Sequence, residues 1–148
     1  APAELVEAGD EASSKHEADE HLEDAPALHD HPPLRLGGGA TIIEALAAGD
    51  LDAFGRAADL SHRNADEALG NQIPETNRLQ ALARELGAHA AAGFGAGFGG
   101  SVWALVDAAD ADAFGERWLG RYLAEFPAVA DTASTLVTRP GGPARRLD

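Results

Sequence analysis

The sequence contains no cysteine and only one lysine, Lys15. The first absence excludes a disulfide framework, thiolate catalysis and thiolate metal sites. The second contributes to a formal net charge of −14. Because phosphate backbones are bound by clustered lysine and arginine, this charge argues against nucleic acid as a partner. A small anionic substrate would need a local exception to the negative field.

Long apolar runs are also missing. No stretch approaches the ~20 residues that span a bilayer, and the acidic start of the chain lacks the basic and apolar regions of a signal peptide. We therefore expect a cytoplasmic protein with no membrane partner. The 148 residues suit one domain. Aromatic residues make up only 5% of them and alanine supplies much of the 45% apolar fraction, so we expect a core of a few tight elements with alanine-rich helix faces.

The first 31 residues carry ten carboxylates and few large apolar side chains. Such a segment cannot bury enough apolar surface to offset its ordering entropy. Pro32-Pro33 and Gly37–Gly39 follow it as chain breakers. We therefore predict an acidic, disordered and dispensable segment over residues 1–38, a packed domain over 39–139, and a flexible tail over 140–148.

Histidines in the acidic segment form a candidate metal site. His16 with Glu20, and Glu17 with His21, are i,i+4 pairs, and His29–His31 lies close by. Imidazole and carboxylate ligands suit a divalent metal. However, His16 and His21 are five residues apart and diverge on a helix. A solvated acidic segment explains the pattern better, and we assign no metal ligands.

Helix and strand patterns occupy the rest of the chain. The first helical stripe follows a possible cap at Asp50 and comprises Leu51, Phe54, Ala58, Ala65 and Leu69. A second helix begins near Pro74 and ends at Gly87. Strands are predicted over 89–94, 101–106 and 132–138, with a helix after Asp107 or Asp110 that ends at Pro127. This order predicts an α+β fold in which two helices precede a small sheet of strand, glycine loop, strand, helix and strand.

Some conspicuous side chains are assigned to structure. Aromatic residues at spacings of four form a stripe on the last helix, which we assign to the core: Phe114, Trp118, Tyr122 and Phe126. His62 and His89 are assigned to packing or supporting contacts, because a lone histidine in a helix or beside a strand is more often structural than catalytic. No side chains suggest a nucleophilic triad, and we assign no catalytic residue.

The glycine-rich segment Gly93–Val106 is the most informative part of the chain. Five of its first eight residues are glycines, which permit positive φ and let backbone N–H groups approach an anion or a sugar hydroxyl. The segment contains a literal Gly-x-Gly-x-x-Gly, but it leads into a strand rather than the helix of a dinucleotide site. No Gly-Lys-Ser/Thr of a Walker loop occurs. A tight bend is the structural alternative, and we expect the substitution Gly97→Val to separate the two.

The glycine segment resembles the third conserved motif of the GHMP small-molecule kinases, and within them the galactokinases. Their C-terminal half carries a Gly-Ala-Gly-Phe-Gly-Gly loop, which is Gly95–Gly100 here, followed by a hydrophobic strand. The segment from Gly49 to His62 resembles a galactokinase helix that ends in Ser-His. Arg84–Ala88 introduces the loop as it does in the family.

The resemblance covers Leu46–Val137, about two-thirds of the chain. Pro74-Glu75-Thr76 stands where the family has a Pro-Glu helix start. The longer string Gly70–Thr76 resembles a bacterial subgroup, since it replaces an acidic stretch of better-known galactokinases.

This resemblance implies the C-terminal fold of a GHMP kinase and ATP- and Mg²⁺-dependent phosphoryl transfer to galactose or a related sugar. It implies a substrate and phosphate loop made of Gly93, Gly95, Ala96, Gly97, Phe98, Gly99, Gly100 and Ser101. The strings that carry the nucleotide loop, catalytic Asp and neighbouring Arg in the family's N-terminal half do not occur here. We therefore expect the sugar and nucleotide to bind together with an N-terminal kinase half. A non-catalytic binding protein, or a truncated remnant of such a kinase, is the alternative.

Overall fold

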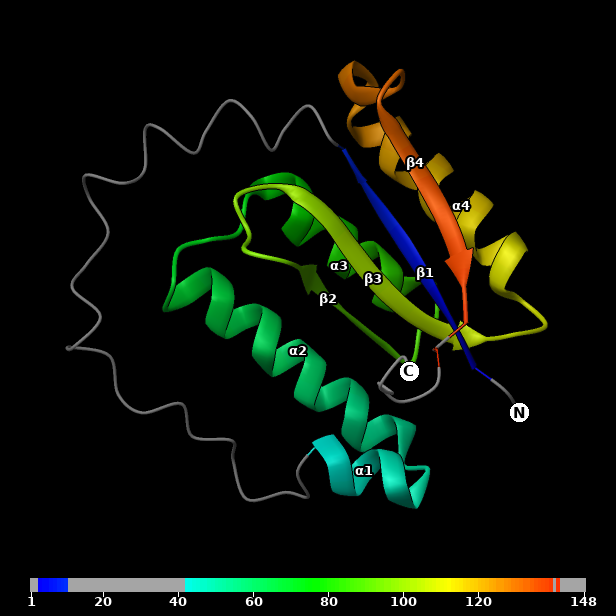
Figure 1. Cartoon of the computed structure of the whole chain (residues 1–148). Helices are drawn as coiled ribbons and strands as arrows, with labels where there is room; N and C mark the ends of the chain where they lie inside the picture. The colour runs from blue at the N-terminus through cyan, green and yellow to red at the C-terminus, as the bar shows by residue number, and fades with distance from the viewer. Residues whose placement is uncertain (1–2, 11–41, 140, 142–148) are drawn as a thin grey trace, which may run out of the picture.

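The computed structural model describes residues 3–10, 42–139 and 141. These residues form a four-stranded antiparallel sheet in the order β2-β3-β1-β4 (Figure 1). The strands are β1 Ala3–Asp10, β2 Ala90–Phe94, β3 Gly100–Asp107 and β4 Ala133–Thr138. The helices are α1 Ile42–Ala48, α2 Leu51–Glu67, α3 Pro74–Glu85 and α4 Ala111–Glu125, and the 3₁₀ turn η2 covers Pro127–Val129. The predicted α+β fold is confirmed.

Strand β1 lies between β3 and β4 (Figure 1). The prediction that residues 1–38 are disordered and dispensable, with the packed domain over 39–139, is therefore wrong for residues 3–10. Val6 and Ala8 are buried, with Val6 opposite Ala104 on one side and Val137 on the other. Cross-strand neighbours on both sides pack against these two side chains, so the strand contributes to the core although three of its residues are acidic. The candidate metal residues between His16 and His31 lie outside the described part of the chain.

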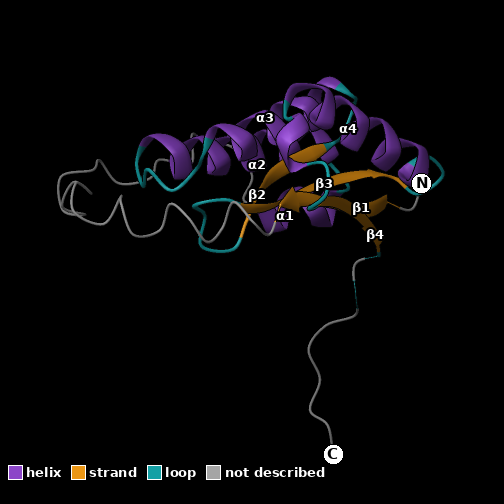
Figure 2. Ribbon diagram, turned by 90° about the horizontal axis from the view of Figure 1, so that it is seen from above, coloured by secondary structure: helices purple, strands orange, loops and turns teal. Residues whose placement is uncertain are grey.

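The main core fills the space between the sheet and helices α3 and α4, which lie on one side of it (Figure 2). Trp118 is fully buried, and its indole Nε1–H donates to the carbonyl oxygen of Leu79 at 3.0 Å. Its ring centroid lies 5.6 Å from that of Phe114. The aromatic stripe is thus core as predicted, with Phe114, Trp118 and Tyr122 buried and Phe126 packed against them.

Helix α2 covers the outer edge of β2 and part of the opposite face of the sheet. Its residues Leu51, Phe54 and Ala58 form a second cluster with Ala90, Trp103 and Leu105. Side chains alternate along a strand, so Leu105 and Trp103 face away from Ala104 and the main core. The predicted N-cap is confirmed, since Asp50 Oδ1 accepts a hydrogen bond from the Ala53 N–H at 2.8 Å. These contacts fix α2 beside the strand that leads into the glycine loop.

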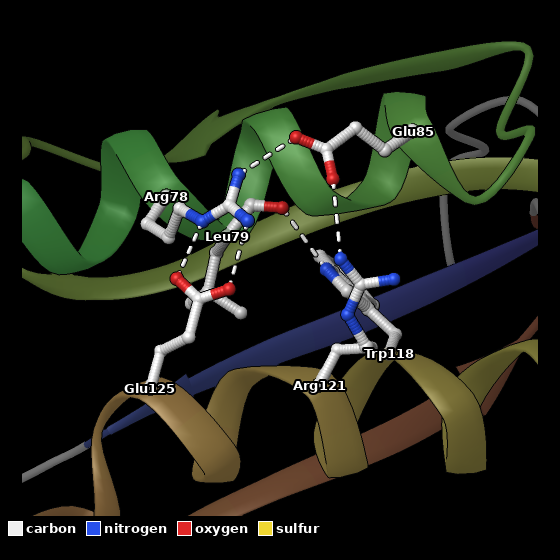
Figure 3. A network of polar contacts seen from close by, with 6 residues as sticks. All are labelled: Arg78, Leu79, Glu85, Trp118, Arg121 and Glu125. Atoms are coloured by element: carbon white, nitrogen blue, oxygen red, sulfur yellow. Dashed lines mark hydrogen bonds and ion pairs between the residues drawn. The ribbon is translucent and has the colours of Figure 1, made fainter.

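Helices α3 and α4 are also joined at the surface by charged side chains (Figure 3). Arg78 contacts both carboxylate oxygens of Glu125, through Nε at 2.6 Å and Nη2 at 2.8 Å. Its Nη1 lies 2.7 Å from Glu85, which also lies 3.4 Å from Arg121. The hydrogen bonds from Arg78 lower the pKa of Glu125 below its ordinary value of 4.5.

We predict that Glu125→Gln lowers the melting temperature slightly at neutral pH and not in acid. A carboxylate whose pKa is lowered on folding contributes stability above its unfolded pKa, and this contribution is lost as pH falls through the folded pKa. Melting curves of both proteins between pH 7 and about pH 2 measure the difference. If the difference in melting temperature between the two proteins grew toward low pH, this contribution from Glu125 would be contradicted.

Candidate functional site

The glycine loop connects β2 and β3 at one end of the sheet (Figure 1). Of the eight residues assigned to it, Gly93 lies in β2, Gly100 and Ser101 lie in β3, and the other five form or adjoin the turn. Positive φ occurs at Gly95, Gly97, Gly99 and Gly100, with values of 83°, 89°, 101° and 93°. Phe98 also has a positive φ of 60°, alone among the non-glycine residues of the described chain. This backbone path requires glycine at several positions.

Asn71, which sequence analysis did not single out, holds the loop from the α2–α3 connection. Its carbonyl oxygen accepts from the Phe98 N–H at 2.6 Å, and its Nδ2 donates to the Ala96 carbonyl oxygen at 2.9 Å. These two bonds explain how Phe98 keeps a left-handed backbone. Gly70, with φ of 62°, turns the chain out of α2 and delivers Asn71 to the loop. The string Gly70–Thr76 drew attention to this segment through its family resemblance. Nothing in the string indicates the contact between Asn71 and the loop.

The loop glycines divide into two groups by what a Cβ would meet. A Cβ on Gly97 would collide with the carbonyl oxygen of Asn71, and one on Gly93 would lie 2.7 Å from Gln72 Oε1. In contrast, a Cβ on Gly95 or Gly100 would meet no described atom within 4 Å. Gly97→Val therefore tests packing against Asn71 and cannot separate ligand approach from a structural bend, contrary to our expectation. Gly95, which is exposed, is the informative position.

His62 on α2 supports the base of the loop. Its Nδ1 accepts a hydrogen bond from the Gly93 N–H at 3.0 Å, and its Nε2 lies 2.9 Å from Asn77 Oδ1 on α3. Asn77 Nδ2 donates in turn to Asp66 Oδ1 at 3.0 Å. Burial lowers the pKa of His62, and the Asn77 hydrogen bond and nearby carboxylates only partly offset this effect. His62 is thus a supporting residue, as predicted.

An open polar cleft of about 500 Å³ lies between α2 and α3 beside this network. Its lining comprises Asp59, His62, Arg63, Asp66, Asn77, Gln80 and Arg84. Most of the cleft side chains are already paired: Gln80 donates to Asp59 at 2.8 Å, and Arg84 lies 3.2 Å from the same carboxylate. The side chains that line the cleft therefore mainly join α2, α3 and β2 to one another. His89, which we assigned to packing or supporting contacts, has its Nε2 3.5 Å from Oδ1 of Asp107 on β3.

Residues 3–10, 42–139 and 141 contain no group of three or more histidine, aspartate and glutamate side chains placed to hold a metal ion. None of the helices observed there combines the length and apolar character that crossing a membrane requires.

Comparison with known proteins places this geometry in a family. Residues 42–125, more than half of the chain, match the model of the family described as GHMP kinases C terminal. The chain is 38% identical over 85 residues to the galactokinase of Pyrococcus furiosus, a match that covers 57% of this chain and 24% of that protein.

Solved structures show the same fold. The structure of Lactococcus lactis galactokinase complexed with galactose superimposes with a TM-score of 0.67 at 22% identity, over 99% of this chain and 47% of that one. The mevalonate kinase of L. major, in complex with R-mevalonate, gives a TM-score of 0.52 at 18% identity over 95% of this chain and 44% of that one. This chain thus spans about a quarter of the matched Pyrococcus protein and about half of each solved kinase. The glycine loop, the order of elements and the matched family model together show that the chain belongs to the GHMP kinase C-terminal family.

Proposed function

We propose that this chain supplies the C-terminal domain of a galactokinase-like sugar kinase, in which the glycine loop contacts the sugar and the transferred phosphate. The phosphoryl donor is ATP, and the catalytic residues come from an N-terminal kinase half. Phosphoryl transfer depends mainly on positioning and charge stabilisation, so a loop of backbone donors is a suitable contribution from a second domain.

The observation that carries this proposal is the run of left-handed residues in the loop, where positive φ occurs at Gly95 and at every residue from Gly97 to Gly100. Gly95 and Gly100 combine positive φ with open space where a side chain would stand. Single glycines in helix-end turns, such as Gly49, share this open space but stand alone, whereas successive left-handed residues present several backbone N–H groups to one ligand. The neighbouring contacts of Asn71 and His62 hold this backbone in place before any ligand arrives.

The family resemblance also implies ATP and Mg²⁺. The described residues suit the phosphate groups of ATP better than they suit the metal ion. Exposed backbone N–H groups in left-handed turns suit a phosphate oxygen. Mg²⁺ requires oxygen ligands, usually carboxylates and phosphates, and the described residues present no cluster of acidic or histidine side chains for it. We therefore assign no Mg²⁺ ligand among the described residues.

A chimera tests the proposed function directly. Residues 42–125 of this chain replace the corresponding segment of the Pyrococcus furiosus galactokinase, and ATP-dependent phosphorylation of galactose is measured. We expect an active chimera, because the exchanged segment would restore the loop next to a complete N-terminal half. A chimera that is folded by circular dichroism but has no kinase activity would overturn the proposal. This chain alone should not phosphorylate galactose when it is supplied with ATP and Mg²⁺.

Within that chimera, we predict that Gly95→Asn lowers kcat/KM about 100-fold, the loss typical of one misplaced backbone donor site. Asparagine tolerates a left-handed backbone, so the substitution mainly fills the space beside the loop. Gly49→Asn is the matched control, because Gly49 has φ of 69° and equally open surroundings in the α1–α2 turn. The α1–α2 turn, which contains Gly49, lies at the opposite end of α2 from the loop (Figure 1). Equal activity of the two variants would contradict ligand approach at Gly95.

A further inference from the structure

We propose that neutral His62 positions the glycine loop, and that protonation of its imidazole releases the base of the loop. This inference rests on the proposed function, because the loop that His62 holds is the loop of that proposed site. Its structural content concerns α2, α3 and β2 alone. His62 contacts no substrate in this arrangement and is a positioning residue rather than a catalytic one.

The anchor is a single hydrogen bond on the outer edge of β2. β2 pairs with β3 on one side, where Gly93 stands opposite Val102. On its other side the Gly93 N–H donates to Nδ1 of His62 at 3.0 Å. An edge strand has backbone groups without a neighbouring strand, and here a side chain from α2 occupies one of them. Because Gly93 lies two residues before Gly95, this bond fixes the point at which the loop begins.

The hydrogen-bond partners specify one tautomer of His62. A nitrogen that accepts from a backbone N–H must carry a lone pair, so the proton of neutral His62 resides on Nε2. That proton faces Asn77 Oδ1 at 2.9 Å. The orientation of the Asn77 amide is set by Asp66, which accepts from Nδ2 at 3.0 Å; the opposite orientation would bring two oxygens together. Each donor in this series then has an acceptor.

The charges around His62 come from two helices. α2 contributes Asp59, Arg63 and Asp66, and α3 contributes Arg84, which pairs with Asp59 at 3.2 Å. The described residues of β2 are alanine, glycine and phenylalanine and contribute no charge. The carboxylates favour the charged imidazole, but burial opposes it more strongly and lowers the pKa of His62 below 6.5. The neutral form therefore prevails at neutral pH, as the Gly93 contact requires.

Protonation would place a proton on Nδ1 opposite the Gly93 N–H. Two donors would then face each other, and the Gly93 amide would lose its acceptor. Folding lowers the pKa of His62, so the neutral network is fully formed above 6.5 and is lost as pH falls from there through the folded pKa. The loop would still be held by the Asn71 contacts to Ala96 and Phe98 and by the pairing of β2 with β3.

Nuclear magnetic resonance of this chain, labelled with ¹⁵N, tests the proposal without substrate. Long-range ¹H–¹⁵N spectra should show the Nε2–H tautomer of His62 at neutral pH. Amide hydrogen exchange of residues 93–99, corrected for intrinsic rates, should lose protection about tenfold, the factor of roughly one hydrogen bond, as His62 titrates. An Nδ1–H tautomer, or loop protection that does not follow the His62 titration, would overturn the proposal.

Three variants separate the anchor from general destabilisation. In His62→Asn, Oδ1 can take the place of Nδ1 without titrating, so protection of the loop should no longer change across this pH range. In His62→Leu, the loop should resemble the acid form at every pH. His89→Asn, which removes a histidine just before β2, should leave the titration of the loop unchanged. A loop titration that persists in His62→Asn would refute the anchor. An inactive chimera with these titrations intact would refute only the kinase function.

Discussion

Deletion of residues 1–10 is expected to abolish the cooperative thermal transition of this chain. β1 is hydrogen-bonded to β3 along one edge and to β4 along the other. Without it, β4 loses its neighbour in the described sheet and the main core loses Val6 and Ala8. No other segment of the described chain pairs with β4 or fills the space of these two side chains. Circular dichroism melting of the deleted and complete chains measures the outcome.

Two substitutions within β1 distinguish strand packing from a general effect of truncation. Val6 is fully buried, so Val6→Asp would place a carboxylate in the core, and we expect a loss of stability above about 4 kcal/mol. Glu7 lies on the opposite face of the strand and is half-buried, so Glu7→Gln should change stability by less than about 0.5 kcal/mol. A deletion variant that melts like the complete chain would show that β1 does not hold the sheet together, and equal stabilities of Val6→Asp and Glu7→Gln would support the same conclusion.

Trp118→Ala is expected to destabilise the fold by about 3–5 kcal/mol, the range for removal of a large buried aromatic side chain. Trp118 has no exposed surface, packs on Phe114 and donates to the Leu79 carbonyl of α3. The substitution removes packing between α3, α4 and the sheet and leaves a cavity where they meet. Chemical denaturation followed by circular dichroism measures the change in unfolding free energy.

Two comparisons refine this prediction. Trp118→Phe keeps an aromatic ring but loses the hydrogen bond to Leu79, so its cost should be smaller, about 1–3 kcal/mol. Phe94 is 57% exposed, so Phe94→Ala should cost less than about 1 kcal/mol. If Trp118→Ala and Phe94→Ala had similar effects, Trp118 would not be the centre of the core.

Local patterns in the sequence were sufficient for most helices and strands. The spacing of Leu51, Phe54 and Ala58 predicted α2, and the four-residue spacing of aromatic residues predicted the buried face of α4. The Gly-rich string between two apolar runs predicted the hairpin of β2 and β3, and its resemblance to a kinase motif indicated the family. These features depend on neighbours within a few residues, so a single sequence contains them.

Strand β1 could not be recognised from local patterns. Ala3–Asp10 has only two large apolar residues, Leu5 and Val6, beside three carboxylates, and a long acidic segment follows it in the sequence. Its partners, β3 and β4, lie about 90 or more residues away in the sequence, and their side chains bury Val6 and Ala8. A composition rule averages over the segment itself and contains no information on such distant partners.

The glycine loop shows the same division within one site. Its glycine content alone predicts that the backbone between β2 and β3 can adopt left-handed conformations, because this freedom is a property of glycine. The surroundings of each glycine become visible only in the folded chain: Gly97 accommodates Asn71, whereas Gly95 faces open space. Folding also brings His62 to Gly93 across 31 residues. Hydrogen bonds and excluded volume act between atoms that folding brings together, and their partners are therefore not encoded in the spacing of residues along the chain.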